Sequence, residues 1–136
     1  MTHRSSVPLF WRLQKAKYNL VGTQCITCKS FYFPPRGVCP KCRSKGFTKK
    51  YEFKHSGTVE AFTVIRSAPE GFENIVPYVV AIIKLDEGPN VSGLLVDPPE
   101  KIDVGKKVKA VFRRISEDGK DGVIQYGLKW QLADNP

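Results

Sequence analysis

The stretch CITCKSFYFPPRGVCPKC, from Cys25 to Cys42, contains all four cysteines of the 136-residue chain. Its spacing is C-x2-C, then ten residues, then C-x2-C. A C-x2-C turn can place two sulfurs about 2.3 Å from one Zn²⁺, and a second turn completes the tetrahedron. The spacing therefore predicts a zinc ribbon whose ligands are Cys25, Cys28, Cys39 and Cys42.

The residues between the two cysteine pairs indicate what kind of site this is. They include neither His nor an acidic residue. Four sulfurs fill the coordination of zinc and leave no position for a water or a substrate, so we expect a structural rather than a catalytic zinc. Two disulfides would need an oxidising compartment, whereas residues 1–20 contain basic residues and no apolar run typical of an export signal. We therefore expect a cytoplasmic protein. A redox dithiol, the third alternative, fits two matched pairs less well.

Basic residues are concentrated in the first part of the chain. Residues 1–56 contain 12 Lys or Arg and one acid, Glu52, whereas residues 57–136 contain 10 Lys or Arg and 12 acids. A basic block predicts an anionic partner, either phosphate of a nucleic acid or cofactor, or an acidic protein surface. A solvated basic surface without a partner is the alternative. No segment approaches the ~20 apolar residues of a membrane span, so no membrane contact is expected.

The hydrophobic pattern predicts one short helix followed by strands. Ser6 and Pro8 are typical of a helix start, and apolar residues at helical spacing extend the helix over about residues 8–17. After the cysteines, five segments are rich in β-branched and aromatic residues, which predicts strands. These segments are 58–65, 78–85, 91–96, 107–115 and 123–130.

The connections between these segments narrow the fold class. Hairpin signals lie at 86–90 and 117–122, and a longer connection at 97–105 joins the third strand to the fourth. The chain is therefore predicted to be mainly β, with a five-stranded closed barrel of the OB type. An SH3-like barrel or a small sandwich is the alternative. A boundary near Lys54–Gly57 gives the expected parts: a helical segment 1–20, a zinc ribbon 21–55 and an OB-fold domain 56–136.

Motifs along most of the chain resemble a known family. They are C-x2-C, F-P-P-R (33–36), C-P-K-C (39–42), S-G-T-V-E-A-F-T-V (56–64), P-E-G-F (69–72), P-Y-V-V-A-I-I-K-L-D-E-G-P (77–89) and I-D-V-G-K-K-V (102–108). This order is similar to that of archaeal and bacterial zinc-ribbon plus OB-fold proteins that accompany thiolases and other acyl-CoA enzymes. Family members often have Gly after the second and the fourth cysteine. This chain has Lys29 and Arg43 there, so we expect slightly different turns.

The resemblance implies an N-terminal helical segment, a rubredoxin-like zinc ribbon and a C-terminal five-stranded OB barrel. It also implies a non-catalytic subunit that docks onto or bridges acyl-CoA enzymes. In archaea such a protein joins acetoacetyl-CoA thiolase to hydroxymethylglutaryl-CoA synthase, and in bacteria similar domains accompany steroid-degrading hydratases and thiolases. The expected partner is therefore a thiolase or a hydroxymethylglutaryl-CoA synthase-like enzyme, and acyl-CoA is a candidate ligand.

Five residues are candidates for contact with CoA or a partner protein: Trp11, Phe33, Arg36, Phe72 and Tyr78. Two prolines stiffen the backbone before Arg36, whose guanidinium could meet a phosphate, a partner carboxylate or an acid of this chain. Trp11 adjoins Phe10, so one ring can face the protein body and the other a partner; packing within the chain is the alternative. Phe33 is the candidate for a ribbon–barrel interface, and Phe72, in a loop, is expected to be exposed.

No catalytic constellation is recognisable in the sequence. His3 and His55 lack a Ser or Cys nucleophile in a known motif, and the adjacent acids Asp86 and Glu87 lie in a hairpin turn, where acids commonly shape the turn. The expected function is therefore a non-catalytic scaffold for acyl-CoA enzymes. A nucleic-acid-binding module is the alternative, favoured by the basic front. Residues 78–96, where an OB barrel commonly binds a strand, offer only Lys84 and Tyr78, so specific nucleic-acid recognition is not expected.

Overall fold

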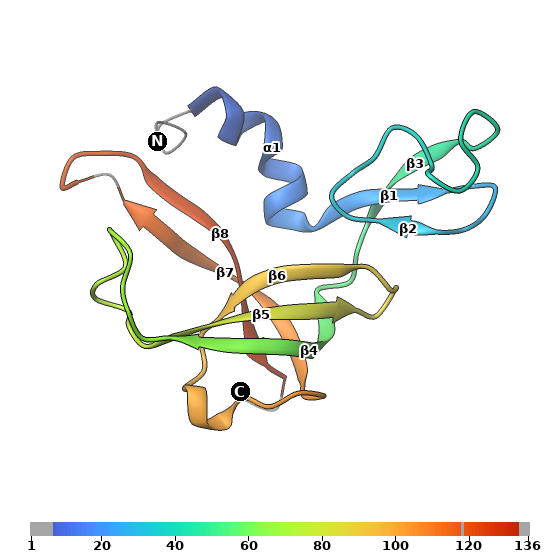
Figure 1. Ribbon diagram of the computed structural model, residues 1–136. Coiled ribbons are helices and arrows are strands. Elements are labelled where there is room, and N and C mark those ends of the chain that lie inside the picture. The colour runs from blue at the N-terminus through green and yellow to red at the C-terminus, as the bar shows by residue number, and fades with distance from the viewer. Residues whose placement is uncertain (1–6, 118, 134–136) are drawn as a thin grey trace. The chain divides into compact units, whose positions relative to one another are not determined.

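The computed structural model describes residues 7–117 and 119–133 of the chain (Figure 1). It separates into two compact units, Met1–Phe53 and Lys54–Pro136, which are described in turn. Among the described residues, no helix has both the length and the apolar character needed to cross a membrane.

The first unit begins with helix α1, Val7–Asn19. The predicted start residue Ser6 lies outside the described residues, and the helix continues two residues beyond the predicted end. It stops where Leu20 adopts a left-handed φ of 49°, a conformation that commonly terminates helices. The Leu20 side chain is buried, whereas no residue of α1 itself is buried. The helix therefore contributes little to the interior of this unit and leaves most of its surface exposed.

Three short antiparallel strands, which the sequence pattern did not predict, form the zinc ribbon. They are β1 (Val21–Cys25), β2 (Phe31–Tyr32) and β3 (Thr48–Glu52), in the order β2-β1-β3. The buried ring of Phe53 is the centre of an aromatic cluster, with ring centroids 5.9 Å from Phe31, 6.2 Å from Phe33 and 5.1 Å from Tyr51. A small aromatic core and the cysteine turns thus make up the interior of the ribbon.

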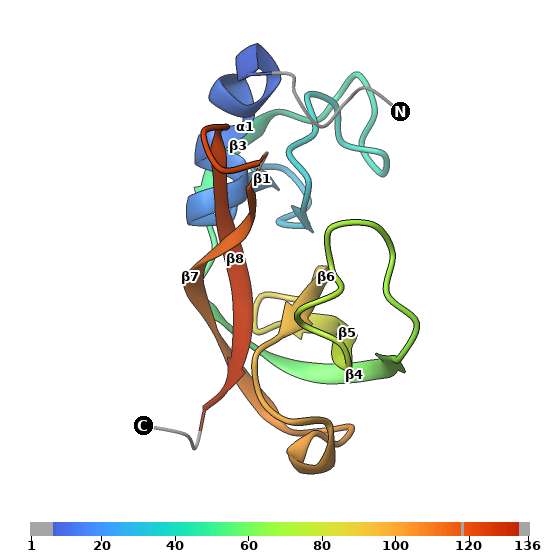
Figure 2. The same cartoon turned by 90° about the vertical axis from the view of Figure 1, so that its left-hand side faces the viewer.

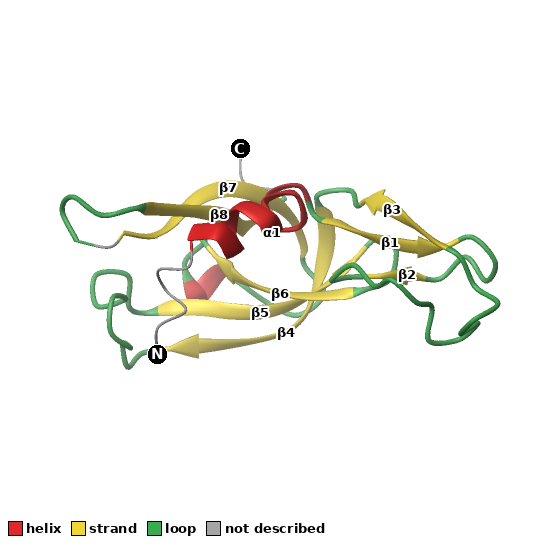
Figure 3. Ribbon diagram, turned by 90° about the horizontal axis from the view of Figure 1, so that it is seen from above, coloured by secondary structure: helices red, strands yellow, loops and turns green. Residues whose placement is uncertain are grey.

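The second unit is a closed five-stranded barrel (Figures 1 and 3). Its elements are β4 (Ser56–Ile65), β5 (Tyr78–Leu85), β6 (Asn90–Leu95), the 3₁₀ turn η2 (Pro99–Lys101), β7 (Lys107–Glu117) and β8 (Ile124–Leu132). Strand order is β4-β5-β6-β8-β7, with β6 parallel to β8 at the pair Leu95–Trp130 and all other neighbours antiparallel. The prediction of an OB-type barrel is confirmed, and the SH3-like and sandwich alternatives are excluded.

Alternate residues of β5 fill the barrel, as the period of two in a strand requires. Val79, Ala81, Ile83 and Leu85 are almost completely buried. Trp130 from β8 is the largest buried side chain. Its indole lies so close to Gly93 of β6 that any side chain at that position would collide with it.

Strands β7 and β8 continue beyond the closed part of the barrel. β7 pairs with β4 only over Lys107–Lys109, and β8 pairs with β6 only at Trp130. The rest of the two strands pair with each other as a two-stranded hairpin (Figure 2). The β4–β5 loop, residues 66–77, lies at the same end of the barrel as the tip of this hairpin.

Candidate functional site

The four cysteines converge on one point of the ribbon. Cys25 ends β1, Cys28 lies in the following turn, and Cys39 and Cys42 come from the second turn. All four sulfurs lie within 4.8 Å of one another, with Cys25 and Cys42 separated by 3.9 Å and Cys28 and Cys39 by 3.6 Å. Sulfurs bound to one zinc at about 2.3 Å in a tetrahedron are about 3.8 Å apart. The ligand set therefore has the dimensions of a four-sulfur zinc site.

Two tight backbone turns bring the sulfurs together. The Lys29 N–H donates to the Cys25 carbonyl at 2.9 Å, and the Arg43 N–H donates to the Cys39 carbonyl at 2.8 Å. Lys29 and Arg43 have positive φ values of 62° and 53°, in the left-handed region that glycine adopts without steric cost. The turns form without glycine at these positions, at a conformational cost of about 1–2 kcal/mol each.

Hydrogen bonds around the sulfurs show how the site balances its charge. The Tyr32 hydroxyl lies 3.4 Å from the Cys39 sulfur and the Cys42 N–H donates to it at 3.5 Å, and these contacts lower the pKa of Cys39 to about 6. Hydrogen bonding to neighbouring sulfurs, first of all that of Cys28, together with burial raises the pKa of Cys42 to about 12. Adjacent sulfurs cannot all ionise without a cation. A divalent ion supplies that charge, so the donor set fits zinc.

Arg36 lies beside this site. Its backbone N–H donates to the hydroxyl of buried Thr23 at 3.1 Å, and its guanidinium lies 5.7 Å from the centre of the Tyr32 ring. Tyr32 in turn contacts the Cys39 sulfur. Arg36 is therefore held at a defined place on the surface near the zinc site, and its side chain is exposed.

A cavity of about 540 Å³ lies between α1 and the segment that precedes Arg36. We call it the front cavity. Its apolar wall consists of Leu13, Ala16, Val21, Phe33, Pro34 and Pro35. Its other lining residues are the cations Arg12, Lys15, Lys17 and Lys50, and no acid is among them. The first unit thus offers an apolar hollow surrounded by positive charge.

Trp11 does not line the front cavity but stands on the same helix. Its side chain is 68% exposed, whereas its neighbour Phe10 is half-buried and carries the Lys17 ammonium over its ring at 4.8 Å. The adjacent rings therefore have different environments. Of the two rings, Trp11 is the more exposed among the described residues.

The two remaining candidates form a pair in the barrel unit. The rings of Phe72 and Tyr78 are 5.7 Å apart, and both side chains are half-buried. Phe72 is thus less exposed than expected from its place in a loop, because it packs on the first residue of β5. Within the same loop, the Glu73 carboxylate accepts a hydrogen bond from the Gly71 N–H at 3.0 Å. This bond and one from the backbone N–H of Glu73 itself lower the pKa of Glu73.

The acids and histidines considered for catalysis have structural surroundings. Asp86 accepts from the Ser56 hydroxyl, and Glu87 accepts from the Lys54 N–H at 3.0 Å. These contacts hold the hairpin turn against the start of β4. His55 is exposed, and its backbone carbonyl accepts a hydrogen bond from the Ala110 N–H. His3 lies outside the described residues.

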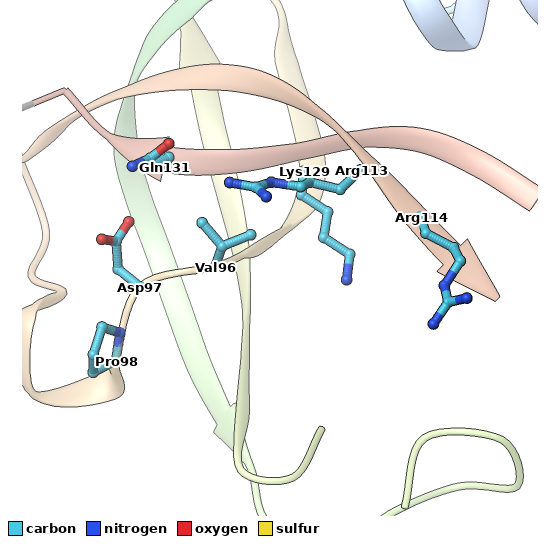
Figure 4. A pocket seen from close by; sticks show the side chains of 7 residues that line it. All are labelled: Val96, Asp97, Pro98, Arg113, Arg114, Lys129 and Gln131. Carbon is cyan, nitrogen blue, oxygen red and sulfur yellow. The ribbon is translucent and has the colours of Figure 1, made fainter. Parts of the chain in front are cut away.

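Sequence reasoning missed a group of basic and aromatic residues on β7 and β8. Phe112 and Tyr126 stack at 5.5 Å with an angle of 12° between their rings, and they are 55% and 44% exposed. Arg113, Arg114 and Lys129 line a second cavity on the same hairpin (Figure 4). A charge count for each strand would have found the cations, because β7 and β8 contain five basic residues and one acid.

Comparison with known proteins assigns both units. Residues 14–48 match the family model described as the ChsH2 rubredoxin-like zinc ribbon domain, and residues 51–113 match the ChsH2 C-terminal OB-fold domain. The zinc-ribbon match and the sulfur geometry together assign a structural zinc ion to the four cysteines.

Three similar proteins illustrate the range of relatives. A DUF35 domain-containing scaffold protein of Methanocaldococcus jannaschii is 46% identical over 92% of this chain and 89% of its own length. A probable enoyl-CoA hydratase alpha subunit of Thermomonospora curvata is 35% identical over 73% of this chain and 31% of its own length. A solved structure described as an Ltp2–ChsH2(DUF35) aldolase is 28% identical, covers 96% of both chains and has a TM-score of 0.69.

Proposed function

The chain belongs to the family of proteins that combine a ChsH2-type zinc ribbon with an OB-fold domain, and from this membership we propose that it is a non-catalytic scaffold subunit of acyl-CoA enzymes. The partner in this proposal is an enzyme of the thiolase or hydroxymethylglutaryl-CoA synthase type in the cytoplasm. Relatives described as scaffold proteins and an aldolase that contains a ChsH2 chain support the scaffold role. The relative described as an enoyl-CoA hydratase subunit supports the acyl-CoA connection.

The observation that carries the proposal is the exposed face of α1 beside the front cavity. The helix has 13 residues and none is buried, although Val7, Leu9, Trp11 and Leu13 are apolar. Trp and Arg are enriched among the residues that contribute most to the stability of protein interfaces, so the exposed Trp11 beside Arg12 is suited to such a contact. The cations that line the front cavity would complement an acidic rim on the partner, and the apolar wall would accept a side chain from it.

Contact with acyl-CoA is part of the same proposal. CoA combines phosphate groups with an apolar, flexible arm. The front cavity combines four cations with an apolar wall and has the volume of a small-molecule site. Docking onto an enzyme would place this cavity against the partner surface, where it could cover part of a bound acyl-CoA.

The non-catalytic role is supported by the chemistry of the described residues. The zinc ligands are four sulfurs, which leave no position for water or substrate. Asp86 and Glu87 bind backbone and hydroxyl groups of the chain itself.

Co-expression with the thiolase encoded nearest to this protein, followed by gel filtration, tests the docking. We expect co-elution, and an increase in the condensation rate of the enzyme in the presence of this protein. Trp11→Ala should weaken the complex by at least about tenfold because truncation of an interface Trp commonly costs about 2 kcal/mol or more. Charge reversal at Arg36 should also weaken it.

Phe47→Ala is the matched control for Trp11→Ala, because Phe47 is 72% exposed in the same unit but lies outside α1 and the front cavity. This variant should bind the enzyme as the native chain does. Failure to co-elute contradicts the docking. Hydrolysis or condensation of acyl-CoA by the purified chain alone contradicts the non-catalytic role.

A nucleic-acid-binding module is the second candidate, since residues 1–56 contain 12 basic residues and one acid. Binding that comes from this charge alone should be blind to sequence and should collapse with salt, because released counterions supply most of its free energy. Filter binding at about 50 and 200 mM salt would show it, with a loss of affinity of roughly a hundredfold or more. Tight binding to one sequence at physiological salt would favour this function over the scaffold.

A further inference from the structure

The hairpin of β7 and β8 has a charge opposite to that of the rest of the barrel. The two strands contain five basic residues and one acid, Glu117. Residues 57–106, which form most of the remaining barrel, contain four basic residues and eight acids. The positive charge is therefore concentrated on one element of a unit that is acidic elsewhere, which is the pattern of a local anion-binding surface.

Two of these cations share one face of the hairpin. Lys129 pairs across the hairpin with Val111, and Arg113 follows Val111 by two residues, so the two side chains leave the same side of the sheet. Figure 4 shows them side by side, with the Arg114 side chain directed into the same open space. Burial and the nearby charge of Arg113 lower the pKa of Lys129. The fold therefore holds like charges together.

Neither Arg113 nor Lys129 forms an ion pair within residues 7–117 and 119–133, whereas Arg114 forms one with Glu117 at 3.2 Å. Asp97 also lines the cavity, and in Figure 4 the Arg113 guanidinium is directed toward the end where Asp97 and Gln131 lie. Asp97 is only 6% exposed and accepts from the Leu132 N–H at 2.7 Å, so it is engaged with the backbone.

The cavity next to these cations has the size of a small-molecule site. Its volume is about 560 Å³, and Gln131 adds an amide to its lining. Guanidinium groups bind phosphate oxygens through two parallel hydrogen bonds, which a single lysine cannot do. We call this space the barrel cavity. Its chemistry is suited to a compact, multiply charged oxyanion rather than to an apolar ligand.

We propose that the barrel cavity binds a phosphate group of a small phosphorylated molecule through Arg113, Lys129 and Arg114. Inorganic phosphate and nucleotides share this chemistry. Phe112 and Tyr126 stack on each other on the opposite face of the hairpin from Arg113 and Lys129, so they are not part of this site. The inference rests on the barrel unit alone and does not depend on docking to an enzyme.

Titration of the ¹⁵N-labelled full chain with ADP, pyrophosphate and adenosine tests the site. We expect ADP and pyrophosphate to shift the amide signals of residues 111–115 and 127–131, and adenosine to leave them unchanged. Tighter binding of ADP than of pyrophosphate identifies a nucleotide site, and equal binding identifies a phosphate site. Arg113→Gln combined with Lys129→Gln should weaken ADP binding by at least about tenfold, because each removes a charge-assisted contact.

Lys84→Gln is the matched control, since Lys84 is an exposed cation of the barrel that does not line the cavity. It should bind ADP as the native chain does. The inference is overturned if ADP and pyrophosphate shift no amide of the hairpin, if the shifts fall only on α1 and the front cavity, or if the double variant binds ADP with unchanged affinity. Shifts confined to α1 would leave the proposed docking function untouched. A melting temperature for each variant checks that it is folded.

Discussion

The zinc ribbon and the barrel differ in what fills their interiors. Of the four buried apolar residues described in the first unit, two are the cysteines Cys25 and Cys39; the others are Leu20 and Phe53. The barrel buries eleven apolar residues, from Val59 to Leu132, with Trp130 the largest. A small module buries too little apolar surface to fold unaided, whereas a closed barrel buries a continuous core. We therefore expect the two units to depend on different interactions.

Removal of zinc should have the largest effect, because it should unfold the ribbon and leave the barrel folded. Structural zinc contributes roughly 10–16 kcal/mol in small zinc-finger peptides, so chelation or Cys25→Ser should unfold the ribbon. The barrel signals of an ¹⁵N correlation spectrum should persist. Elemental analysis should find one zinc per chain in the native protein and none in the variant. A native protein with four reactive thiols and no metal would contradict the assignment.

The converse experiment removes the centre of the barrel. Trp130→Ala should lower the free energy of unfolding of the barrel by about 3–5 kcal/mol, because it deletes a large buried side chain and leaves a cavity. The zinc content of the ribbon should not change. Phe112→Ala, a change at a half-exposed ring, is the control and should cost about 1 kcal/mol or less. Urea unfolding followed by circular dichroism gives both values.

Substitution of Gly46, which lies beside the zinc ligands, tests how strongly zinc binding depends on the packing of the cysteine turns. A Cβ at Gly46 would lie 2.6 Å from the Cys42 Cβ and 3.1 Å from the Cys39 Cβ, whereas a Cβ at Gly37 meets nothing within 4 Å. Gly46→Ala should therefore weaken zinc retention and cost about 1–3 kcal/mol, because overpacking displaces the ligands. Gly37→Ala should behave as the native chain. Competition with a chromogenic chelator measures the difference; equal zinc retention in the two variants would contradict it.

The smallest effect is expected at the two left-handed residues of the zinc turns. Lys29→Gly or Arg43→Gly removes the conformational cost of a positive φ but increases the entropy of the unfolded chain. The net change should be within about 1 kcal/mol and in the stabilising direction, since a left-handed residue other than glycine costs about 1–2 kcal/mol. Thermal unfolding of the zinc-bound protein measures it. A clear loss of stability would show that these side chains make contacts that outweigh the strain.

Several features of the fold were predictable because their signals are local in sequence. The five barrel strands lie close to the predicted segments, since alternation along a strand is a pattern within a few residues. The order of short and long connections between them identified the OB topology. The cysteine spacing identified the metal ligands because a C-x2-C turn fixes two sulfurs by itself.

Other features could not be predicted because they depend on residues far apart in sequence. Strands β1 to β3 are short and polar, and they form because the zinc turns align them. Phe72 was expected to be exposed, but β5 provides Tyr78 for it to pack against. The exposure of Trp11 follows from how little of α1 the ribbon covers, which no periodicity reports.

The sequence by itself therefore determined the zinc ligands, the class of the barrel and the family, because each is encoded in short motifs or in the spacing of neighbouring residues. Only the tertiary structure decided which side chains meet at a surface. Lys129 and Arg113 lie on one face because antiparallel pairing sets the register of β7 on β8. Leu13, Phe33 and Lys50 line one cavity because the fold of the first unit brings α1, β3 and the segment around Pro34 together. Such encounters depend on chain closure over long separations, which local patterns do not encode.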